Sequence, residues 1–279
     1  MEKRKIYVYS NDTEVSLKTA DLLRKKLEQS CFEVPSEYDE DAELIVVIGG
    51  DGAFLQAVHL FNFPHIPFIG INTGHLGFFQ EINPEQLDEF IFNYKNNKYK
   101  LQSMTTVKGV LRLASGNNSG GNAAGEIASE INLKGLNEIV IRNDDMHSIH
   151  LNLSIGGSFI ERFSGDGIIV STAAGSTAYN YSLGGSIVDP RLQMLQVTPI
   201  APMNTTAYRC FTSSILVPSD LDLSIMPEVG TKSVVIAVDG ESRTYTNVKN
   251  IDICVSNTVV NLLRFEGYDF WNKVKTKFL

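Results

Sequence analysis

The chain has 279 residues, of which 43% are hydrophobic and 20% are charged, and its formal net charge at pH 7 is -8. The length favours two domains of about 100 to 150 residues, and the acidic balance argues against nucleic acid or an anionic membrane surface as the main partner. The 3 cysteines are scattered without a Cys-x-x-Cys pair, and we find neither an export signal nor an apolar run of about 18 residues. These features exclude a disulfide scaffold, a zinc site and a membrane span, and they favour the cytoplasm.

The first hundred residues alternate strand and helix patterns. Apolar runs at Ile6 to Tyr9, Leu44 to Ile48 and Phe68 to Ile71 predict three buried strands. A helix is predicted after the first strand, with an apolar face made of Leu17, Ala20, Leu23 and Leu27. A second helix is predicted from Ala53 to Leu60, and a third opens at Asn83-Pro84 with proline at its first position. This alternation predicts an α/β N-terminal domain with a mainly parallel sheet.

Beyond about residue 100 the sequence is typical of a mostly β C-terminal domain. The predicted strands are Val107 to Leu113, Glu138 to Arg142, Ile149 to Ile155, Ile168 to Ser171, Ile215 to Val217, Val234 to Val238 and Ile251 to Val255. We therefore divide the chain into an α/β domain at 1–102 and a β-rich domain at 103–257. Residues 258–279 either complete the first domain or form a free C-terminal helix.

The strand Leu44 to Ile48 runs into the turn Gly49-Gly50-Asp51-Gly52. Glycines without side chains let backbone amides approach a phosphate closely and adopt positive φ, and Asp51 is the only reactive side chain at this turn. A carboxylate there can take a proton from an attacking hydroxyl or hold Mg²⁺, and both roles occur in kinases. The alternative interpretation is a tight turn in which Asp51 only caps the following helix.

The strand Phe68 to Ile71 also ends in a glycine-rich turn, Gly70 to Phe79. Two successive strands that end this way place both turns at one sheet edge, where open α/β folds bind their ligands. The sequence contains no Gly-x-x-x-x-Gly-Lys-Ser/Thr loop and hence no Walker lysine. Mg²⁺ and the glycine amides must then balance much of a donor's charge, with help from basic residues that the sequence does not rank: Arg142, Arg162, Arg209 and Lys232.

A second constellation follows, in which Gly165-Asp166-Gly167 stands beside an apolar strand and the small-residue turn Ser171 to Thr177 leads into Tyr179. Small residues let a flat ring lie against the backbone, hydroxyls supply directional hydrogen bonds, and Tyr179 offers a stacking or edge contact. This pattern is typical of a nucleoside pocket. The alternative interpretation is a loop and helix cap with Tyr179 packed in the core.

Together these motifs resemble the NAD kinase family. The resembling segments keep the family's order and are Gly49 to Gly52, Gly70 to Phe79, Leu136 to Glu138, Ser164 to Ser182 and Thr198 to Pro202. The first is shared with lipid kinases of the diacylglycerol type and with phosphofructokinases, whereas the fourth is much more specific. The resemblance implies Mg²⁺-dependent phosphoryl transfer from ATP or polyphosphate to the adenosine-ribose 2′-hydroxyl of NAD, giving NADP. It also implies an N-terminal α/β domain, a C-terminal β domain that binds NAD, and a homodimer or homotetramer.

The resemblance assigns roles to individual residues as well. Asp51 matches the base that acts on the 2′-hydroxyl, and Asn137 and Glu138 match the pair that engages ribose hydroxyls. The residues matched to the NAD site are Asp51, Gly52, Phe78, Phe79, Asn137, Glu138, Asp166, Ala174, Thr177, Ala178, Tyr179, Asn180, Tyr181, Ser182 and Ala201. The amides matched to the phosphate donor are those of Gly49, Gly50 and Gly52. The metal ligands are not assigned, and the cofactor is Mg²⁺ or another divalent cation.

Two departures from the family pattern fall in the site. Most members have Thr-Pro-Thr-Gly or Thr-Pro-Ser-Gly where this chain has Thr172-Ala173-Ala174-Gly175. The hydroxyl missing at Ala174 could bond adenine, and one such bond is worth roughly 0.5 to 1.5 kcal/mol, so NAD affinity could fall about tenfold. Ser164 stands where many members carry Arg or Lys, which removes a charge from the site.

Three other functions are compared with this one. A lipid or sugar kinase would share Gly49 to Gly52 but would not need the dinucleotide pocket of Ser164 to Ser182. An NAD(P)-dependent oxidoreductase would show Gly-x-Gly-x-x-Gly after its first strand, where this chain has Ser-Asn-Asp-Thr. A nucleotide sensor without catalysis is the alternative left open, although the presence of Asp51 gives no sign of an inactive site.

Overall fold

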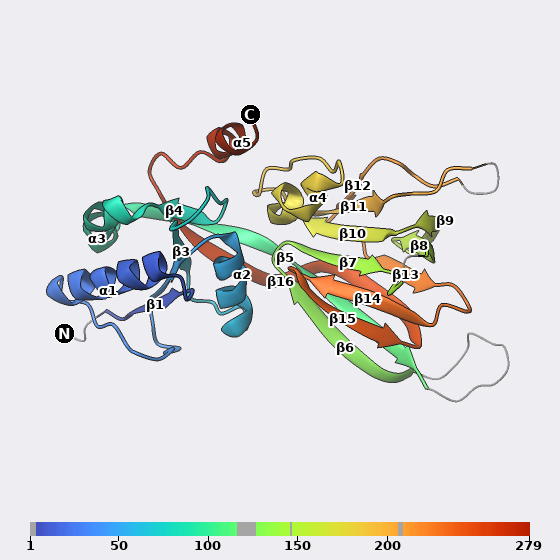
Figure 1. Ribbon diagram of the computed structural model, residues 1–279, viewed down its shortest axis with the longest axis horizontal. Helices are drawn as coiled ribbons and strands as arrows, with labels where there is room; N and C mark the ends of the chain where they lie inside the picture. The colour runs from blue at the N-terminus through green and yellow to red at the C-terminus, as the bar shows by residue number, and fades with distance from the viewer. Residues whose placement is uncertain (1–3, 116–126, 146, 206–208) are drawn as a thin grey trace. The chain divides into compact units, whose positions relative to one another are not determined.

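The computed structural model describes residues 4–115, 127–145, 147–205 and 209–279 of the chain (Figure 1). They form two compact units, of which unit 1 is Met1–Met104 with Val259–Leu279 and unit 2 is Thr105–Thr258. In these described ranges, no helix combines the length and the apolar composition that a membrane crossing requires. The predicted fold class is confirmed, since parallel strands dominate the N-terminal region and the region after it is mostly β.

Unit 1 is an α/β unit around a parallel sheet. Its elements are β1 (Ile6–Ser10), α1 (Glu14–Gln29), β2 (Leu44–Ile48), α2 (Asp51–Leu60), β3 (Phe68–Ile71), β4 (Gln80–Ile82), the 3₁₀ helix Pro84–Gln86, α3 (Leu87–Lys95) and α5 (Phe270–Phe278). Strand β2 pairs in parallel with β1 and β3, and β3 also pairs in parallel with β4 and, at Leu262, with β16 (Val248–Phe265). The residues near the end of the chain thus complete this sheet.

Helices cover both faces of this sheet. Helices α1 and α3 share one apolar core with alternate residues of the strands, such as Val46 and Ile69. Helix α2 places Phe54 against Phe68 of β3, with ring centroids 5.5 Å apart. The α1 face differs from the prediction at one position, because Leu17 is 45% exposed while Ala20, Leu23 and Leu27 are buried. Thr13 caps α1 by accepting a hydrogen bond from the Ser16 amide. Ser16 is the buried residue of the first turn, so the buried face of the helix passes through Ser16 and not through Leu17.

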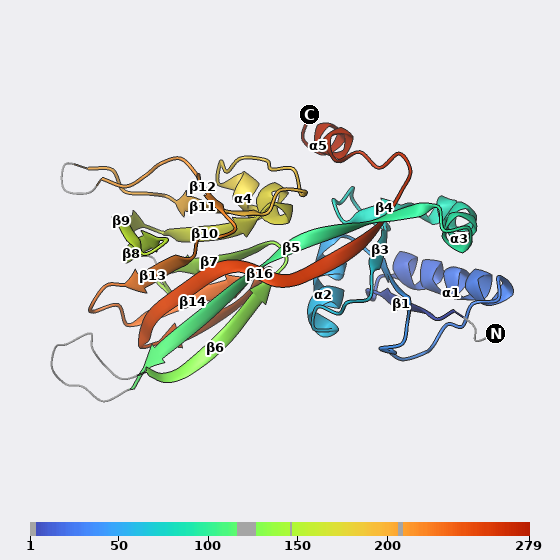
Figure 2. The same ribbon diagram turned by 180° about the vertical axis from the view of Figure 1, so that it is seen from behind.

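Unit 2 is built from two sheets. Its elements are most of β5 (Tyr99–Ala114), β6 (Ile127–Gly135), β7 (Glu138–Arg142), β8 (Ile149–Ile155), β9 (Ser158–Gly165), β10 (Gly167–Thr172), the 3₁₀ helix Ala174–Thr177, α4 (Tyr179–Ser182), β11 (Met194–Ile200), β12 (Ile215–Pro218), β13 (Leu223–Pro227), β14 (Ser233–Val238), β15 (Glu241–Thr246) and most of β16. One sheet has the order β12-β11-β10-β7-β14-β15. In the other, β5 pairs with β6 and β16, and β16 leads through β13 and β8 to β9 (Figure 2). A single apolar core, which includes Phe163, Ile168 and Ile236, lies between the inner faces.

Several strands of unit 2 were not predicted. In β15, five of six residues are exposed, and its sheet edge position leaves little apolar alternation to detect. Residues Asp239 and Gly240, which connect β14 to β15, both have positive φ, at 49° and 91°. An Asp-Gly pair between two strands is a strong signal of a two-residue hairpin, so this turn was predictable.

Candidate functional site

The turn between β2 and α2 presents the Asp51 carboxylate to the glycine-rich turn that follows β3. Gly50 is the N-cap and Asp51 the first helical residue, two positions before the predicted start at Ala53. The side chain does not cap its own helix, so that interpretation of Asp51 is wrong. Instead, Oδ1 accepts from the amides of Phe78 at 3.0 Å and Phe79 at 3.1 Å, and Oδ2 lies 3.1 Å from the Phe78 amide.

The three glycines beside Asp51 differ in their surroundings. The Gly49 amide donates to the Ile71 carbonyl at 3.0 Å, so it joins the turn to β3 instead of pointing at a ligand. Gly49 also has a φ of 154°, and a Cβ there would lie 2.5 Å from the Cβ of Ala53. A Cβ on Gly50 or Gly52 would meet open space. Gly50 and Gly52 therefore have open space where a side chain would lie, which Gly49 does not.

Gly77 lets the turn approach Asp51 closely. A Cβ on Gly77 would lie 2.4 Å from Asp51 Oδ1 and 1.8 Å from Gln80 Oε1. The Gln80 side chain is buried, and its Nε2 and Oε1 have no hydrogen-bond partner within the described part of the chain. The position of the carboxylate thus depends on the missing side chain at Gly77.

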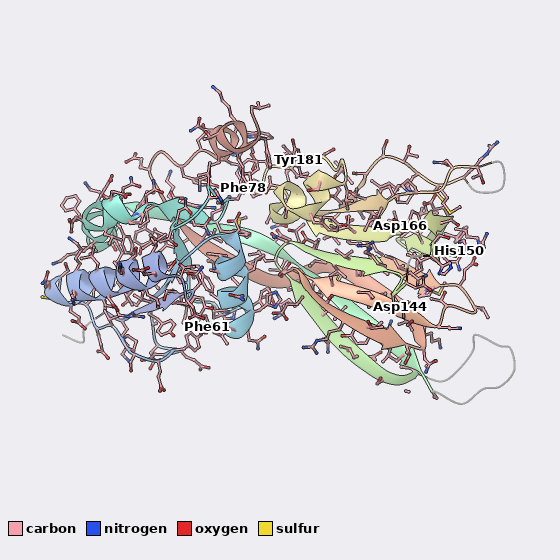
Figure 3. The ribbon with its side chains drawn as sticks, viewed as in Figure 1. Phe61, Phe78, Asp144, His150, Asp166 and Tyr181 are labelled. Atoms are coloured by element: carbon pink, nitrogen blue, oxygen red, sulfur yellow. The ribbon has the colours of Figure 1, made fainter. Side chains whose placement is uncertain are left out.

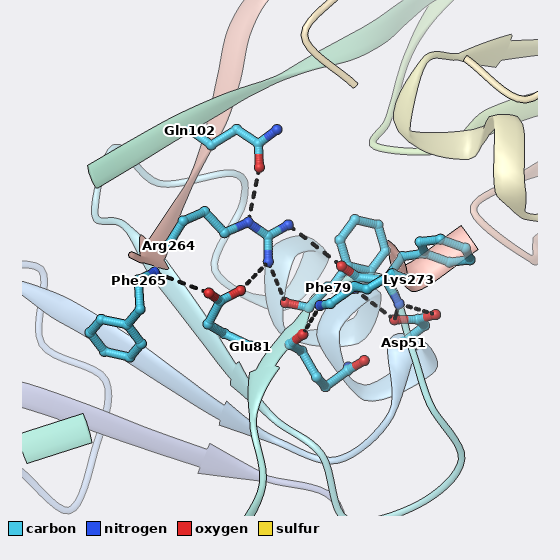
Figure 4. Close-up of polar contacts among 9 residues, drawn as sticks. Asp51, Phe79, Glu81, Gln102, Arg264, Phe265 and Lys273 are labelled. Carbon is cyan, nitrogen blue, oxygen red and sulfur yellow. Dashed lines mark hydrogen bonds and ion pairs between the residues drawn. The ribbon is translucent and has the colours of Figure 1, made fainter. Parts of the chain in front are cut away.

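A buried ion pair between Arg264 and Glu81 lies on the other side of Phe79 from Asp51 (Figure 4). Arg264 Nη1 is 3.0 Å from Glu81 Oε2, and both side chains are 5% exposed. The same guanidinium donates to the Phe79 carbonyl at 3.4 Å and the Phe78 carbonyl at 3.5 Å. These two residues therefore give their amides to Asp51 and their carbonyls to Arg264. The pair fixes the backbone that orients the carboxylate, and breaking it would leave a buried charge unpaired.

Helix α5 brings two lysines to this region. Lys277 Nζ lies 3.6 Å from Asp51 Oδ2 and 4.8 Å from the centroid of the Phe78 ring. Lys273 donates to the Gln80 carbonyl, and burial together with the neighbouring Arg264 lowers its pKa to about 8. The i,i+4 spacing places the two ammonium groups on one face of the helix.

The sequence did not identify these lysines. It offered four other basic residues, of which Arg162 forms an ion pair with Glu228, with Nη2 2.8 Å from Oε2. The α5 lysines were hidden because they lie near the chain end, in a segment predicted only as amphipathic. The signal that could have found them is their i,i+4 spacing among the aromatic residues Phe270, Trp271 and Phe278.

A second polar group lies in unit 2 at the start of β7. The Asp239 carboxylate accepts from three successive amides, those of Leu136 at 2.7 Å, Asn137 at 2.7 Å and Glu138 at 3.1 Å. Thr172 then ties the end of β10 to the same segment, because its amide donates to the Asn137 carbonyl at 2.8 Å. The structure thus joins the predicted pair Asn137 and Glu138 to the segment that follows Thr172.

Glu138 is in an unusual environment for a carboxyl group. It is 6% exposed, and burial together with the negative Asp239 raises its pKa to about 8. Asn137 Oδ1 and Glu138 Oε2 are buried and lack a hydrogen-bond partner among the described residues. Unpaired buried polar atoms are rare and are a reason to expect a ligand or water there. A ligand that brings hydroxyl groups would satisfy both atoms.

The segment from Ala174 to Ser182 turns along this group. Tyr179 is 38% exposed and Tyr181 40% exposed, so the interpretation of Tyr179 as a core residue is wrong. Asn180, by contrast, is fully buried, accepts from Thr198 Oγ1 at 2.7 Å and donates to the Ser176 carbonyl at 3.4 Å. Its side chain holds the segment together. Ala174, Thr177 and Ala178 are half-buried, and Ser182 is exposed.

Asp166 and Ala201 lie at the other end of β10. The Asp166 amide donates to the Ile200 carbonyl at 2.9 Å, which places Asp166 next to Ala201. Since β10 has 6 residues and a strand rises about 3.3 Å per residue, this end is roughly 16 Å from Thr172. In Figure 3, Asp166 and Tyr181 lie at different places along this part of the chain. Within one chain, Asp166 does not join the group around Glu138. Ser164 beside it is buried, with its Oγ 2.7 Å from His150 Nδ1.

Family comparisons match most of the chain. The ATP-NAD kinase N-terminal domain matches residues 5–99 and the ATP-NAD kinase C-terminal domain matches residues 136–265. An NAD kinase of Finegoldia magna is 39% identical over 277 residues, covering 98% of this chain and 97% of that protein. NAD kinase 1 of Oceanobacillus iheyensis is 32% identical and covers 92% and 93% of the two chains.

Solved structures share the fold. The yeast NADH kinase complexed with NADH has a TM-score of 0.82 at 20% identity, covering 98% of this chain and 86% of its own. An NAD kinase from Archaeoglobus fulgidus in complex with ATP has a TM-score of 0.73 at 24% identity, covering 98% and 99%. At these identities the likeness shows a common fold.

Proposed function

Since the chain belongs to the NAD kinase family of phosphotransferases, we propose that it transfers the terminal phosphoryl group of ATP or polyphosphate to the adenosine-ribose 2′-hydroxyl of NAD. The observation that carries the proposal is the orientation of Asp51 by two backbone amides. A carboxylate held in this way can accept a proton from a hydroxyl without reorganising. The product is NADP, and we propose that the reaction takes place in the cytoplasm.

The two oxygens of Asp51 have different roles. Oδ1 accepts from two amides, which uses both of its lone pairs, whereas Oδ2 shares only the Phe78 amide at 3.1 Å. Oδ2 therefore keeps the capacity to accept the proton of the 2′-hydroxyl as that oxygen attacks phosphorus. General-base catalysis of this kind contributes roughly 10² to 10⁴ in rate.

Asn137 and Glu138 support the recognition of a sugar. Among the described residues, the buried atoms Asn137 Oδ1 and Glu138 Oε2 have no hydrogen-bond partner. Both atoms therefore favour a ligand that carries hydroxyl groups. A Glu138 that keeps its proton near neutral pH can accept a hydrogen bond at one oxygen and donate one at the other. A ribose has both functions on each hydroxyl. The exposed rings of Tyr179 and Tyr181 are suited to contact a base.

We expect Mg²⁺ to enter with the phosphate donor. This ion keeps several waters and is usually bound by one or two carboxylates plus substrate phosphates. Asp51 supplies one such carboxylate, while Glu81 is committed to Arg264. The described residues contain no group of three or more His, Cys, Asp or Glu that could hold a metal ion. The donor set therefore fits an ion held through the donor's phosphates, where it would neutralise their charge.

The purified chain is incubated with NAD, Mg²⁺ and either ATP or polyphosphate, and NADP is measured with an NADP-specific dehydrogenase. We expect NADP to form with at least one donor and its rate to fall about 10²- to 10⁴-fold in Asp51→Asn. Omission of the metal separates the Mg²⁺ requirement, and light scattering tests the expected homodimer or homotetramer. If NAD binds but NADP never forms, the alternative of a nucleotide sensor replaces this proposal.

A further inference from the structure

We propose that Lys277, near the end of α5, binds the phosphoryl group while it passes from the donor to NAD. This inference rests on the proposed function and deepens it by naming the cation of the donor site. The sequence contains no Walker lysine, and the chain carries a formal net charge of -8. A negatively charged donor therefore needs a local positive charge beside the attacking hydroxyl, and α5 supplies one.

Lys277 lies close enough to Asp51 to reach a phosphoryl group beside it. Lys277 Nζ lies 3.6 Å from Asp51 Oδ2, the oxygen that keeps an acceptor position. A hydroxyl that donates to Oδ2 would lie about 2.6 to 3.2 Å from it, and the phosphorus it attacks about 3 to 3.5 Å further. The phosphoryl oxygens would then fall within reach of the same ammonium. A lysine is a flexible cation with three donors, and it can turn from Oδ2 to those oxygens.

Helix α5 is fixed to the turn that orients Asp51. Phe78 lies between the two ends of the helix, with its ring 5.9 Å from Phe270 and 5.7 Å from Phe278. The Asp269 side chain caps the helix by accepting from the amides of Trp271 and Asn272. Lys277 therefore extends from a docked helix, which reduces the entropy lost when it binds a phosphate.

The charged groups around Asp51 carry more positive than negative charge. Three cations, Arg264, Lys273 and Lys277, face two carboxylates, Glu81 and Asp51, in the contacts described above. Tyr268 stacks under Arg264 at 3.9 Å and under Lys273 at 5.1 Å, so the buried cations are held in place. Arg264 is paired with Glu81, and Lys273 is committed to the Gln80 carbonyl. Lys277 is the most exposed of the three, with 31% of its side chain accessible, whereas Lys273 is half-buried and Arg264 is buried.

Lys277 takes no part in the proton transfer. The 2′-oxygen forms a bond to the terminal phosphorus, and the bond from that phosphorus to the bridging oxygen of the donor breaks. Asp51 takes the hydroxyl proton, and the leaving phosphate keeps the electron pair of the broken bond. Lys277 remains an ammonium throughout and balances the charge on the oxygens of the phosphoryl group, which is the kind of stabilisation that accelerates such transfers.

A different reading of the contact is that Lys277 only closes Asp51 off as a salt bridge. The two interpretations predict different changes of activity when Lys277 is removed. A blocking lysine would slow the reaction, so its removal would leave activity equal or higher. If Lys277 binds the phosphoryl group, its removal would weaken the binding of the phosphate donor and leave the binding of NAD unchanged.

The test compares Lys277→Met, Lys277→Arg and the control Lys275→Met, which removes an exposed lysine from the same helix. For Lys277→Met we expect kcat/KM for the donor to fall about 10²- to 10³-fold, as for the loss of one transition-state donor. NAD affinity, measured by calorimetry, should not change. Lys277→Arg should recover most of the loss, and Lys275→Met should behave as the parent. If Lys277→Met does not fold, Lys277→Gln takes its place.

Tripolyphosphate titration supplies a second readout that does not depend on turnover. We expect the parent and Lys275→Met to bind tripolyphosphate and Lys277→Met to bind it more weakly, with a smaller salt dependence. Parent-like donor kinetics and tripolyphosphate affinity in Lys277→Met would overturn the inference. A parent chain that forms no NADP would overturn the proposed function instead, and the titration would still decide the role of Lys277.

Discussion

Two carboxyl groups of this chain, the half-buried Asp51 and the buried Glu138, are held in opposite ways. Around Asp51, in unit 1, stand the amides of Phe78 and Phe79 and the ammonium of Lys277. Around Glu138, in unit 2, the charged neighbour is another carboxylate, Asp239, and the pKa of Glu138 rises to about 8. Amides and cations favour the charged form of an acid, whereas burial beside a like charge favours the neutral form.

The difference matches two separate tasks. A group that takes a proton from a hydroxyl must be ionised before the reaction begins. A group that recognises a sugar must offer both a donor and an acceptor, which a protonated carboxyl can do. The two groups belong to different units of the chain.

This contrast is broken most strongly when the orientation of Asp51 is disturbed without changing its charge. A Cβ in Gly77→Ala would lie 2.4 Å from Asp51 Oδ1, so the carboxylate must move. A misplacement of about 1 Å can cost roughly 10²-fold in rate, and we expect kcat to fall by about that factor. The measurement is the rate of NADP formation at saturating substrates.

Gly74→Ala is the matched control for this change. It lies in the same turn, and a Cβ there would meet open space. Its kcat should equal that of the parent. Equal rates in both variants would show that the reaction does not depend on where Gly77 lets the carboxylate lie.

The next effect concerns Glu138 and the pH dependence of folding. Its folded pKa of about 8 lies above the ordinary value of 4.5 for a glutamic acid. Between these values the folded chain holds a proton that the unfolded chain has lost, so the free energy of unfolding falls as pH rises. From pH 5 to 8, the parent should lose on the order of 3 kcal/mol more than Glu138→Gln. Urea unfolding at both pH values measures the difference.

Glu241→Gln serves as the control, because this exposed residue lies on β15 of the same unit. Its change of stability with pH should follow that of the parent. Parallel curves for the parent and Glu138→Gln would mean that Glu138 is ionised at neutral pH, and the contrast with Asp51 would then disappear.

The sequence predicts the framework of unit 1 well because its central strands are buried on both faces. The continuous apolar runs Leu44 to Ile48 and Phe68 to Ile71 have the same bounds as β2 and β3. The glycines that follow them indicate where the turns lie, and Asp51 is the single acid between them. Local pattern is sufficient here, since burial and turn chemistry agree over a few residues.

The partners of these acids depend on contacts that no local pattern contains. Lys277 reaches Asp51 because the end of the chain returns to unit 1, and the spacing of α5 predicts a helix without saying what it faces. Asp239 stands in a predictable Asp-Gly turn, yet its bonds to the amides of Asn137 and Glu138 follow from the pairing of β14 with β7. Asp166 shows the converse, because a motif contiguous in sequence is split between the two ends of β10.

The smallest effect on the pH dependence of folding should come from Lys273→Met. Its sign should be opposite to that of Glu138→Gln. Burial and the neighbouring Arg264 lower the pKa of this ammonium from 10.5 to about 8. Between these values the unfolded chain holds a proton that the folded chain has lost, so the free energy of unfolding rises with pH. From pH 8 to 10 the parent should gain up to about 2 kcal/mol relative to Lys273→Met, with Lys275→Met following the parent. This slope is opposite to that of Glu138, because a buried cation is relieved by losing its proton and a buried acid by keeping it. A flat difference between parent and Lys273→Met would mean that neighbouring acids, Glu81 and Asp51, compensate the buried charge fully.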